Sequence, residues 1–360
     1  MGWTRPGGVL AACLALAACA SQALEPGSRD SLPAVLAGPA DAGVHDLRAA
    51  YRGALCPRLP PGSPPCDEVL LRLPGEGEAV AAAPRPELSG RYRIAFVPGL
   101  FSECFERVVQ PFSDAQRALR AEGFDADYFR VSGRGTAAAN ADQIARQVDE
   151  LAADPRPLIV FAYSKGLADT LEFLLRHPER AQRIAAIVSV AGAANGTPLA
   201  QRMQASYRGL AALFPFPDCA AGSGDEIDDL RPEVRLGWWR RNWHAVTVPV
   251  FALVAAPRPD RVSPATRATY HLLAQVDARN DGRLIWSDQI VPGGYLLGYA
   301  NADHWAVVAP VAEAMPALSF AFRDGVPRPA LVRAAIEVVG ATLESDRAHA
   351  PASGASPGAQ

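Results

Sequence analysis

Short, mostly apolar runs alternate with segments of helical periodicity through the middle of the chain, and this rhythm constrains the fold more than any other feature. The apolar runs lie at 91–97, 127–131, 158–162, 184–191 and 248–255, and the helical patterns between them at 106–122, 140–152 and 165–177. Strands that are apolar throughout are buried on both faces, and helical connections make successive strands parallel. The sequence therefore predicts an α/β fold with a mostly parallel central sheet flanked by helices.

The regions outside this rhythm set the expected domain boundaries around a main domain at 89–345. Residues 19–88 are rich in Pro, Ala and Gly, which favours an irregular tether or extension with short ordered pieces at 45–51 and 69–73. Residues 346–360 have the composition of a disordered tail. An insertion at about 198–245, with three Trp in six positions, is expected to form a helical cap or lid. Its Trp side chains either contact an apolar substrate or pack the insertion onto the core.

The N-terminus has the pattern of an export signal. Arg5 precedes an apolar run at 9–18 that is too short to span a bilayer. Leu16-Ala17-Ala18-Cys19 is similar to the lipobox of bacterial lipoproteins, so 1–18 is expected to be removed and Cys19 acylated. A plain secretory signal cut near 20–23 is the alternative, and Cys13 gives a weaker second match. Because no Asp follows Cys19, the lipoprotein pattern implies an outer-membrane anchor facing the periplasm or the cell surface.

Four cysteines remain once Cys13 and Cys19 are removed or lipidated, namely Cys56, Cys66, Cys104 and Cys219. An even number in an oxidising compartment predicts two disulfides. Three pairings are possible, and we favour the local pair Cys56–Cys66, which leaves Cys104–Cys219. No pair has the spacing of a thiolate metal site, so no metal is expected. The formal net charge of −3 gives no reason to expect a nucleic acid partner.

The pentapeptide Ala162-Tyr163-Ser164-Lys165-Gly166 lies where a predicted strand meets a predicted helix. It matches the nucleophile motif G-x-S-x-G except for Ala162, which is still small enough for strand and helix to approach closely. The N–H of Lys165, at a helix N-terminus, could face a developing oxyanion. A serine that only caps the helix is the alternative.

Residues 162–200 resemble the bacterial lipase and esterase group of α/β-hydrolases, and the resemblance extends over about 91–320. Besides the pentapeptide, the matching stretches are His177-Pro178-Glu179-Arg180, Ser189-Val190-Ala191-Gly192 and Gly196-Thr197-Pro198-Leu199-Ala200. Pro98-Gly99-Leu100 resembles the oxyanion loop of these enzymes, which makes the Leu100 N–H the second donor. Pro98 replaces the usual His there, and an ordinary turn is the alternative.

A serine nucleophile needs a general base, and in this fold the chain order is Ser, acid, His. Asn301-Ala302-Asp303-His304-Trp305 resembles the segment that carries the base, which implies His304; a buried His bonded to Asp303 is the alternative. Asn280-Asp281-Gly282 resembles the loop that carries the acid. Asp281 is favoured, and Asp260 and Asp288 stay open as candidates.

The resemblance implies hydrolysis of a carboxylic ester or lipid by an acyl-enzyme mechanism that needs no cofactor. Two other interpretations remain. Ala162 and Pro98 favour a surface lipoprotein that keeps the fold as a binding module without catalysis. A thioesterase or lactonase would use the same Ser164, Asp281 and His304 with a different pocket.

Overall fold

A single sheet of eight strands organises the molecule. The computed structural model describes residues 43–81, 85, 87–206, 219–220 and 222–349. The strand order is β1-β8-β7-β6-β5-β3-β4, and β2 pairs antiparallel with β8 while every other pairing is parallel. The strands are β1 (His45–Asp46), β2 (Leu70–Leu71), β3 (Arg93–Val97), β4 (Ala126–Tyr128), β5 (Leu158–Tyr163), β6 (Ile184–Val190), β7 (Val250–Ala255) and β8 (Tyr295–Ala300). This is the mostly parallel sheet that the apolar runs predict.

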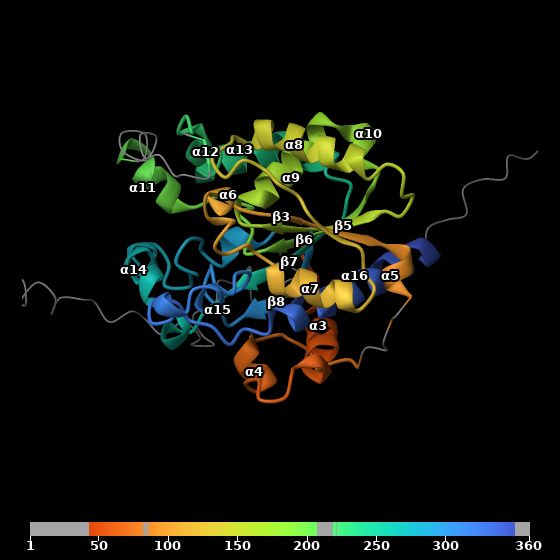
Figure 1. Ribbon diagram of the computed structural model, residues 1–360, viewed down its shortest axis with the longest axis horizontal. Helices are drawn as coiled ribbons and strands as arrows, with labels where there is room; N and C mark the ends of the chain where they lie inside the picture. Colours follow the sequence, from red (N-terminus) through yellow and green to blue (C-terminus); the bar gives the residue numbers. More distant parts are fainter. Residues whose placement is uncertain (1–42, 82–84, 86, 207–218, 221, 350–360) are drawn as a thin grey trace, which may run out of the picture.

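Helices cover both faces of this sheet (Figure 1). Above it in the view lie α8 (Ala137–Glu150), α9 (Lys165–Arg176), α10 (Pro178–Ala181) and α13 (Pro232–Asn242); below it lie α3 (Arg48–Leu55), α7 (Ser113–Ala121) and α16 (Arg328–His349). The remaining helices are α4 (Cys66–Val69), α5 (Leu88–Arg91), α6 (Ser102–Phe105), α11 (Pro198–Ser206), α12 (Asp225–Asp228), α14 (Arg267–Ala274) and α15 (Val311–Ala314). Because every residue of β5 and β7 is buried, both faces need this cover.

The prediction of one helix over 106–122 is wrong for the first half of that range. The structure has the short α6 before it and begins α7 only at Ser113. Phe112, which precedes α7, has a left-handed backbone with φ 63°. Pro111 lacks an N–H and disfavours a helical residue before it, so the helical pattern cannot run through this point.

The short ordered pieces expected at 45–51 and 69–73 are present, but from residue 43 onward the described part of 19–88 joins the sheet and is not an irregular tether. β1 and β2 both pair with β8, and α3 packs against α16. The guanidinium of Arg52 is buried with Glu76 and Asp67 as ion partners and donates to the carbonyl of Leu70. A Pro- and Gly-rich composition does not reveal such long-range partners. Residues 19–42 lie outside the described residues.

Two disulfides join the pairs that we favoured, Cys56–Cys66 and Cys104–Cys219. The second connects α6 to the insertion at 198–245, whose described parts are helical in α11, α12 and α13. Trp238 and Trp239 of α13 are buried, and their indole N–H groups donate to Glu172 of α9 and to the carbonyl of Ala194. These two Trp side chains therefore pack the insertion onto the core.

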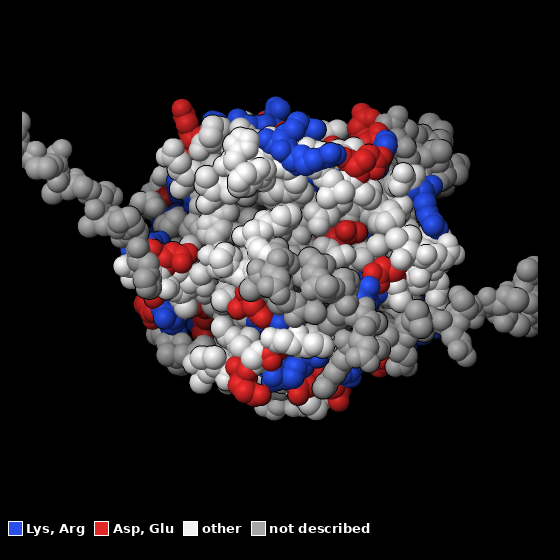
Figure 2. All heavy atoms as spheres, turned by 180° about the vertical axis from the view of Figure 1, so that it is seen from behind, with Lys and Arg blue, Asp and Glu red and all other residues white. Residues whose placement is uncertain are grey.

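At the C-terminus, α16 continues to His349, so the expected boundary of a disordered tail at 346 is too early. Residues 350–360 lie outside the described residues. In the ranges that the structure describes, no helix combines the length and the apolar character that a membrane crossing requires. The face shown in Figure 2 carries acidic and basic side chains side by side, with uncharged surface between them. This mixture agrees with the small net charge of the chain.

Candidate active site

Ser164 lies at the sharp turn between β5 and α9, with the strained backbone angles φ 54° and ψ −121°. A non-glycine residue with positive φ is costly and persists only where its surroundings impose it. Gly166 allows the helix to pack this closely on the end of β3, because a Cβ on it would lie 2.5 Å from the carbonyl oxygen of Pro98 and 2.7 Å from that of Val97. The turn therefore projects the Ser164 side chain beyond the end of β5.

The loop after β3 passes directly beside this turn. A Cβ on Gly99 would lie 2.8 Å from the Cβ of Ser164, so only glycine fits between them. Leu100 is the residue after Gly99. Within the described part of the chain, its N–H donates no backbone hydrogen bond. Lys165 is the first residue of α9, where helix N–H groups have no acceptor within the helix. Two amides next to Ser164 are thus available to an oxyanion.

His304, in the loop after β8, contacts Ser164 directly. Its Nε2 is 2.9 Å from Ser164 Oγ, and its Nδ1 is 2.8 Å from Asp281 Oδ2. The imidazole is buried and packs on the ring of Tyr163, whose hydroxyl donates to the His304 carbonyl at 3.0 Å. The His304 N–H also donates to the Asp281 carbonyl at 3.0 Å. The structure brings the three residues expected from the sequence into one hydrogen-bonded chain.

Both carboxylate oxygens of the fully buried Asp281 are occupied. Oδ1 accepts the backbone N–H groups of Arg283 and Leu284, both at 2.7 Å. Oδ2, which faces His304, also accepts from Gln289 Nε2 at 3.2 Å. Gln289 is itself fixed to the backbone of Ala255 at the end of β7. The backbone thus determines which oxygen faces the imidazole.

The other candidate carboxylates do not reach His304. Asp260 is exposed on a short turn after β7, and none of its contacts involves the imidazole. The Asp288 carboxylate makes no hydrogen bond to the imidazole either. Burial, with the nearby charge of Asp277, raises its pKa to about 7. Asp303 accepts from the Ser263 and Ala306 amides and from the Thr266 hydroxyl, so it braces the loop rather than His304. The alternative of a His bonded to Asp303 is therefore wrong.

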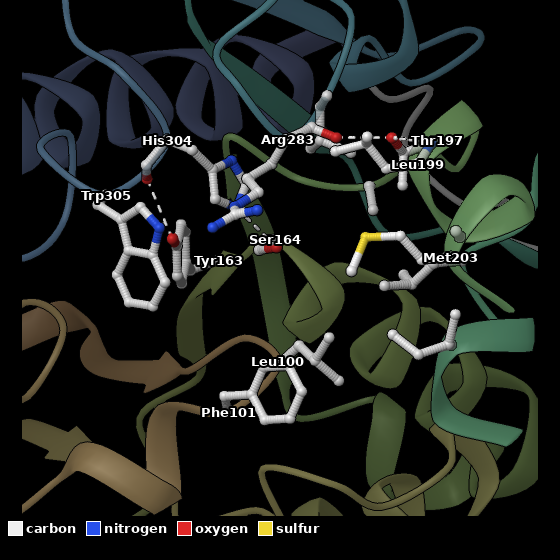
Figure 3. A pocket seen from close by; sticks show the side chains of 15 residues that line it. Leu100, Phe101, Tyr163, Ser164, Thr197, Leu199, Met203, Arg283, His304 and Trp305 are labelled. Atoms are coloured by element: carbon white, nitrogen blue, oxygen red, sulfur yellow. Dashed lines mark hydrogen bonds between the residues drawn. The ribbon is translucent and has the colours of Figure 1, made fainter. Parts of the chain in front are cut away.

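A pocket of about 400 Å³ opens over Ser164 and His304 (Figure 3). Most of its wall is apolar. The side chains that line it are Leu100, Phe101, Tyr163, Ser164, Ala193, Thr197, Leu199, Ala200, Met203, Ile227, Leu230, Arg283, Leu284, His304 and Trp305. Several of these come from α11 and α12, so the insertion contributes one wall of the pocket.

A buried charge cluster behind the nucleophile was missed by sequence reasoning. The ammonium of Lys165 pairs with Asp169 one turn along α9, and both side chains are buried. Asn140 of α8 donates to the same carboxylate at 2.8 Å. Burial raises the pKa of Asp169 to about 6 and lowers that of Arg235 to about 10. The signal was an (i, i+4) pair of opposite charges in the first half of an amphipathic helix, next to the nucleophile.

The remaining described histidines lie elsewhere. His177 contacts Asp142 at 2.8 Å on the surface, and His45 stacks on Tyr295 at the edge of the sheet. Across the part of the chain that the structure describes, no three His, Cys, Asp or Glu side chains are grouped to hold a metal ion. Cys19, expected to carry a lipid, lies outside the described residues.

Comparisons with known proteins place this geometry in a family. No protein-family model matches the sequence, and a search of curated proteins finds no match. Among solved structures, the lipase BlEst2 of Bacillus licheniformis in its propeptide form is 17% identical, with TM-score 0.52, 66% of this chain covered and 50% of that chain; it shows the fold alone. A metagenomic carboxyl esterase, MGS0156, is 31% identical with TM-score 0.75, and the match covers 94% of this chain and 100% of that one. With this identity over nearly its whole length, the chain belongs to the carboxyl esterase family of α/β-hydrolases.

Proposed function

We propose that this protein hydrolyses carboxylic esters through an acyl-enzyme formed on Ser164, with His304 as general base and Asp281 as its partner. The observation that carries the proposal is the unbroken hydrogen-bonded chain from Ser164 Oγ through both imidazole nitrogens to Asp281. A serine hydroxyl is a weak nucleophile unless a base takes its proton, and that base works only in one tautomer. With Nδ1–H donating to Asp281, the unprotonated Nε2 faces the hydroxyl.

In the first half of the reaction, Ser164 Oγ attacks the ester carbonyl carbon while His304 Nε2 takes the hydroxyl proton. The tetrahedral oxyanion accepts from the N–H groups of Leu100 and Lys165, which lie on either side of the nucleophile. Collapse of this intermediate breaks the bond to the leaving oxygen, which takes the proton from Nε2. The alcohol departs, and the acyl group remains on Ser164.

Water completes the cycle by the reverse sequence. His304 Nε2 removes a proton from the water as its oxygen attacks the acyl carbon, and the same two amides hold the second oxyanion. The bond to Oγ then breaks, Ser164 recovers its proton from the imidazolium, and the carboxylic acid leaves. Asp281 stays ionised and stabilises the imidazolium through both halves.

The wall of the pocket favours a hydrophobic acyl group. Leu199, Met203, Ile227 and Leu230 face the space beside Ser164, and all four come from the insertion at 198–245. Burying each methylene of an acyl chain against such a wall contributes about 0.8 kcal/mol. We therefore expect kcat/KM to rise from acetyl to butyryl and hexanoyl esters. Turnover of acetyl esters alone would contradict this assignment.

Wild type and the Ser164→Ala variant decide the central proposal. We expect a fluorophosphonate probe to label wild type and not Ser164→Ala, and ester hydrolysis to fall by at least about 10⁴-fold in that variant. His304→Ala should lose activity to a similar degree. His177→Ala is the matched control and should keep activity, since His177 contacts Asp142, Arg180 and the ring of Phe173, none of which lines the pocket. A folded wild type that neither labels nor hydrolyses any ester would favour the binding-module interpretation instead.

We also propose, from the sequence, that the protein is exported and anchored to the bacterial envelope by a lipid on Cys19. The two disulfides are consistent with an oxidising compartment. Metabolic labelling with a palmitate analogue tests the anchor: the wild type should be labelled and partition with membranes, and Cys19→Ser should do neither. Labelling of neither protein, with both secreted, would instead indicate the plain secretory signal.

A further inference from the structure

The mechanism leaves one charged side chain of the pocket without a role. Among the described residues that line the pocket, Arg283 is the only one whose side chain is permanently charged. It lies two positions after Asp281 and is half-buried. Figure 3 shows its guanidinium reaching into the pocket in the region of His304 and Ser164, while Leu199 and Met203 lie on the other side. An arginine carries five donors in a planar fork that suits carboxylate and phosphate oxygens.

Within the described part of the chain, no carboxylate forms an ion pair with this guanidinium. Its side-chain hydrogen bond there is a long one, 3.4 Å, from Nη1 to the hydroxyl of Thr269. Asp281 and Asp303, the buried carboxylates of the loops that carry Arg283 and His304, have their oxygens occupied by other donors. A half-buried guanidinium without an ion partner keeps its donors free for an anionic ligand, which would replace the water around it. The position therefore points to a negatively charged group on the substrate.

The backbone around Arg283 is fixed, so the guanidinium is presented from a rigid support. Its N–H donates to Asp281 Oδ1 at 2.7 Å, and its carbonyl accepts from the Thr197 hydroxyl at 2.6 Å. Neither bond involves the side chain. Replacement of the side chain should consequently leave the backbone that holds Asp281 in place.

The location also indicates which end of the ester carries the charge. His304 Nε2 delivers its proton to the leaving oxygen, so the alcohol part of the ester departs on the imidazole side of the pocket. Two hydrogen bonds between Asp281 and His304 hold the turn that carries Asp281 and Arg283 on the imidazole side of the pocket. The apolar wall of Leu199 and Met203 lies opposite and suits the acyl chain.

Building on the proposed esterase function, we propose that Arg283 forms an anion subsite and that the preferred substrates are esters of a hydrophobic acid with an alcohol bearing a carboxylate or phosphate. The acyl chain lies against the apolar wall, and the anionic group of the alcohol part pairs with the guanidinium. Arg283 acts as a specificity-determining residue through this contact.

Matched esters with one acyl group test the subsite. The probes are para-butyryloxybenzoate, para-butyryloxyphenyl phosphate and the neutral methyl para-butyryloxybenzoate. The measured quantity is the ratio of kcat/KM for each anionic ester to that for the neutral one. We expect Arg283→Gln to lower this ratio by about ten- to a hundredfold, the range for loss of hydrogen bonds to a charged group. Arg283→Lys should retain much of the ratio. Arg202→Gln, which removes an exposed arginine from α11, is the matched control and should retain all of it.

The outcomes separate this inference from the function on which it rests. A lowered ratio for either anion supports the subsite, and the anion with the larger change identifies the group that is bound. An unchanged ratio, in a variant that still hydrolyses esters, overturns the subsite and leaves the esterase proposal intact. If the ratio changes only when the carboxylate is on the acyl side, as in mono-para-nitrophenyl glutarate against its methyl ester, the assignment to the alcohol side is wrong. Absence of Ser164-dependent hydrolysis in wild type would instead overturn the proposed function.

Discussion

The nucleophile and its base reach the pocket from two regions that are held in place by different forces. Around Ser164, the turn between β5 and α9 is held by close backbone packing against the loop after β3. Around His304, the loops after β7 and β8 are held by hydrogen bonds on buried carboxylates. Asp281 and Asp303 together accept from backbone amides, a hydroxyl, an amide side chain and the imidazole.

Because packing holds one region and hydrogen bonds hold the other, the two regions should respond to different kinds of substitution. The turn at Ser164 and the loop after β3 should be most sensitive to added volume, because close contacts between their atoms hold them in place. The base region should tolerate little change in hydrogen-bonding capacity, because a buried donor that loses its acceptor bears the full cost of desolvation. Three substitutions test this contrast, beginning with the largest expected effect.

Asp281→Asn should reduce kcat by about 10⁴-fold with little change in volume. The amides of Arg283 and Leu284 would hold the one remaining oxygen at the Oδ1 position, which turns the new NH₂ group toward His304. The imidazole would then carry its proton on Nε2 and could not act as base. Steady-state kinetics on a butyryl ester measure the loss.

Asp260→Asn is the matched control for that measurement, since its exposed carboxylate makes no contact with His304. We expect it to retain activity. A large loss in Asp260→Asn together with an active Asp281→Asn would exchange the assignments of the two carboxylates.

Gly99→Ala should reduce kcat by about 10²–10³-fold, the loss typical of a displaced oxyanion donor. The added methyl would lie 2.8 Å from the Cβ of Ser164 and 3.1 Å from the Tyr163 carbonyl, so the loop bearing Leu100 must move. Gly90→Ala is the control, because nothing lies within 4 Å of a Cβ at Gly90. If both variants kept full activity, close packing would not be what positions the loop.

Asp288→Asn should have the smallest effect and should change stability rather than rate. Burial raises the Asp288 pKa from 3.8 to about 7, so between these values the folded state binds a proton that the unfolded chain releases. The stability of wild type therefore falls as pH rises through this window. The variant lacks this loss and should be more stable above pH 7 by about 1–2 kcal/mol, allowing for partial solvent screening.

Urea unfolding at several pH values checks this last expectation. The two proteins should differ least near pH 4 and most above pH 7. A constant difference at all pH values would mean that the carboxyl group of Asp288 does not titrate in this window, and that its pKa is not raised by burial.

The strands and the site differ in how far the sequence could predict them. Continuous apolar runs predicted the parallel strands correctly, because a strand buried on both faces is apolar at every position, and this can be read from a short stretch of sequence. The turn at Ser164 also has a local pattern. The N-D-G resemblance favoured Asp281 but left Asp260 open, since the choice depends on a distance to His304 that no local pattern contains. Arg52 was missed for the same reason: its partners are distant in the chain.

The sequence by itself determined the α/β architecture and the candidates Ser164 and His304, because each follows from a periodicity or a short motif. It also favoured the disulfide pairing, because Cys56 and Cys66 are close in the chain. The tertiary structure alone decided that the Asp281 carboxylate faces the imidazole, that residues 43–73 complete the sheet, and that Arg283 enters the pocket. These features depend on atoms brought together from remote segments, and the geometry of such contacts is not encoded in any local stretch of residues.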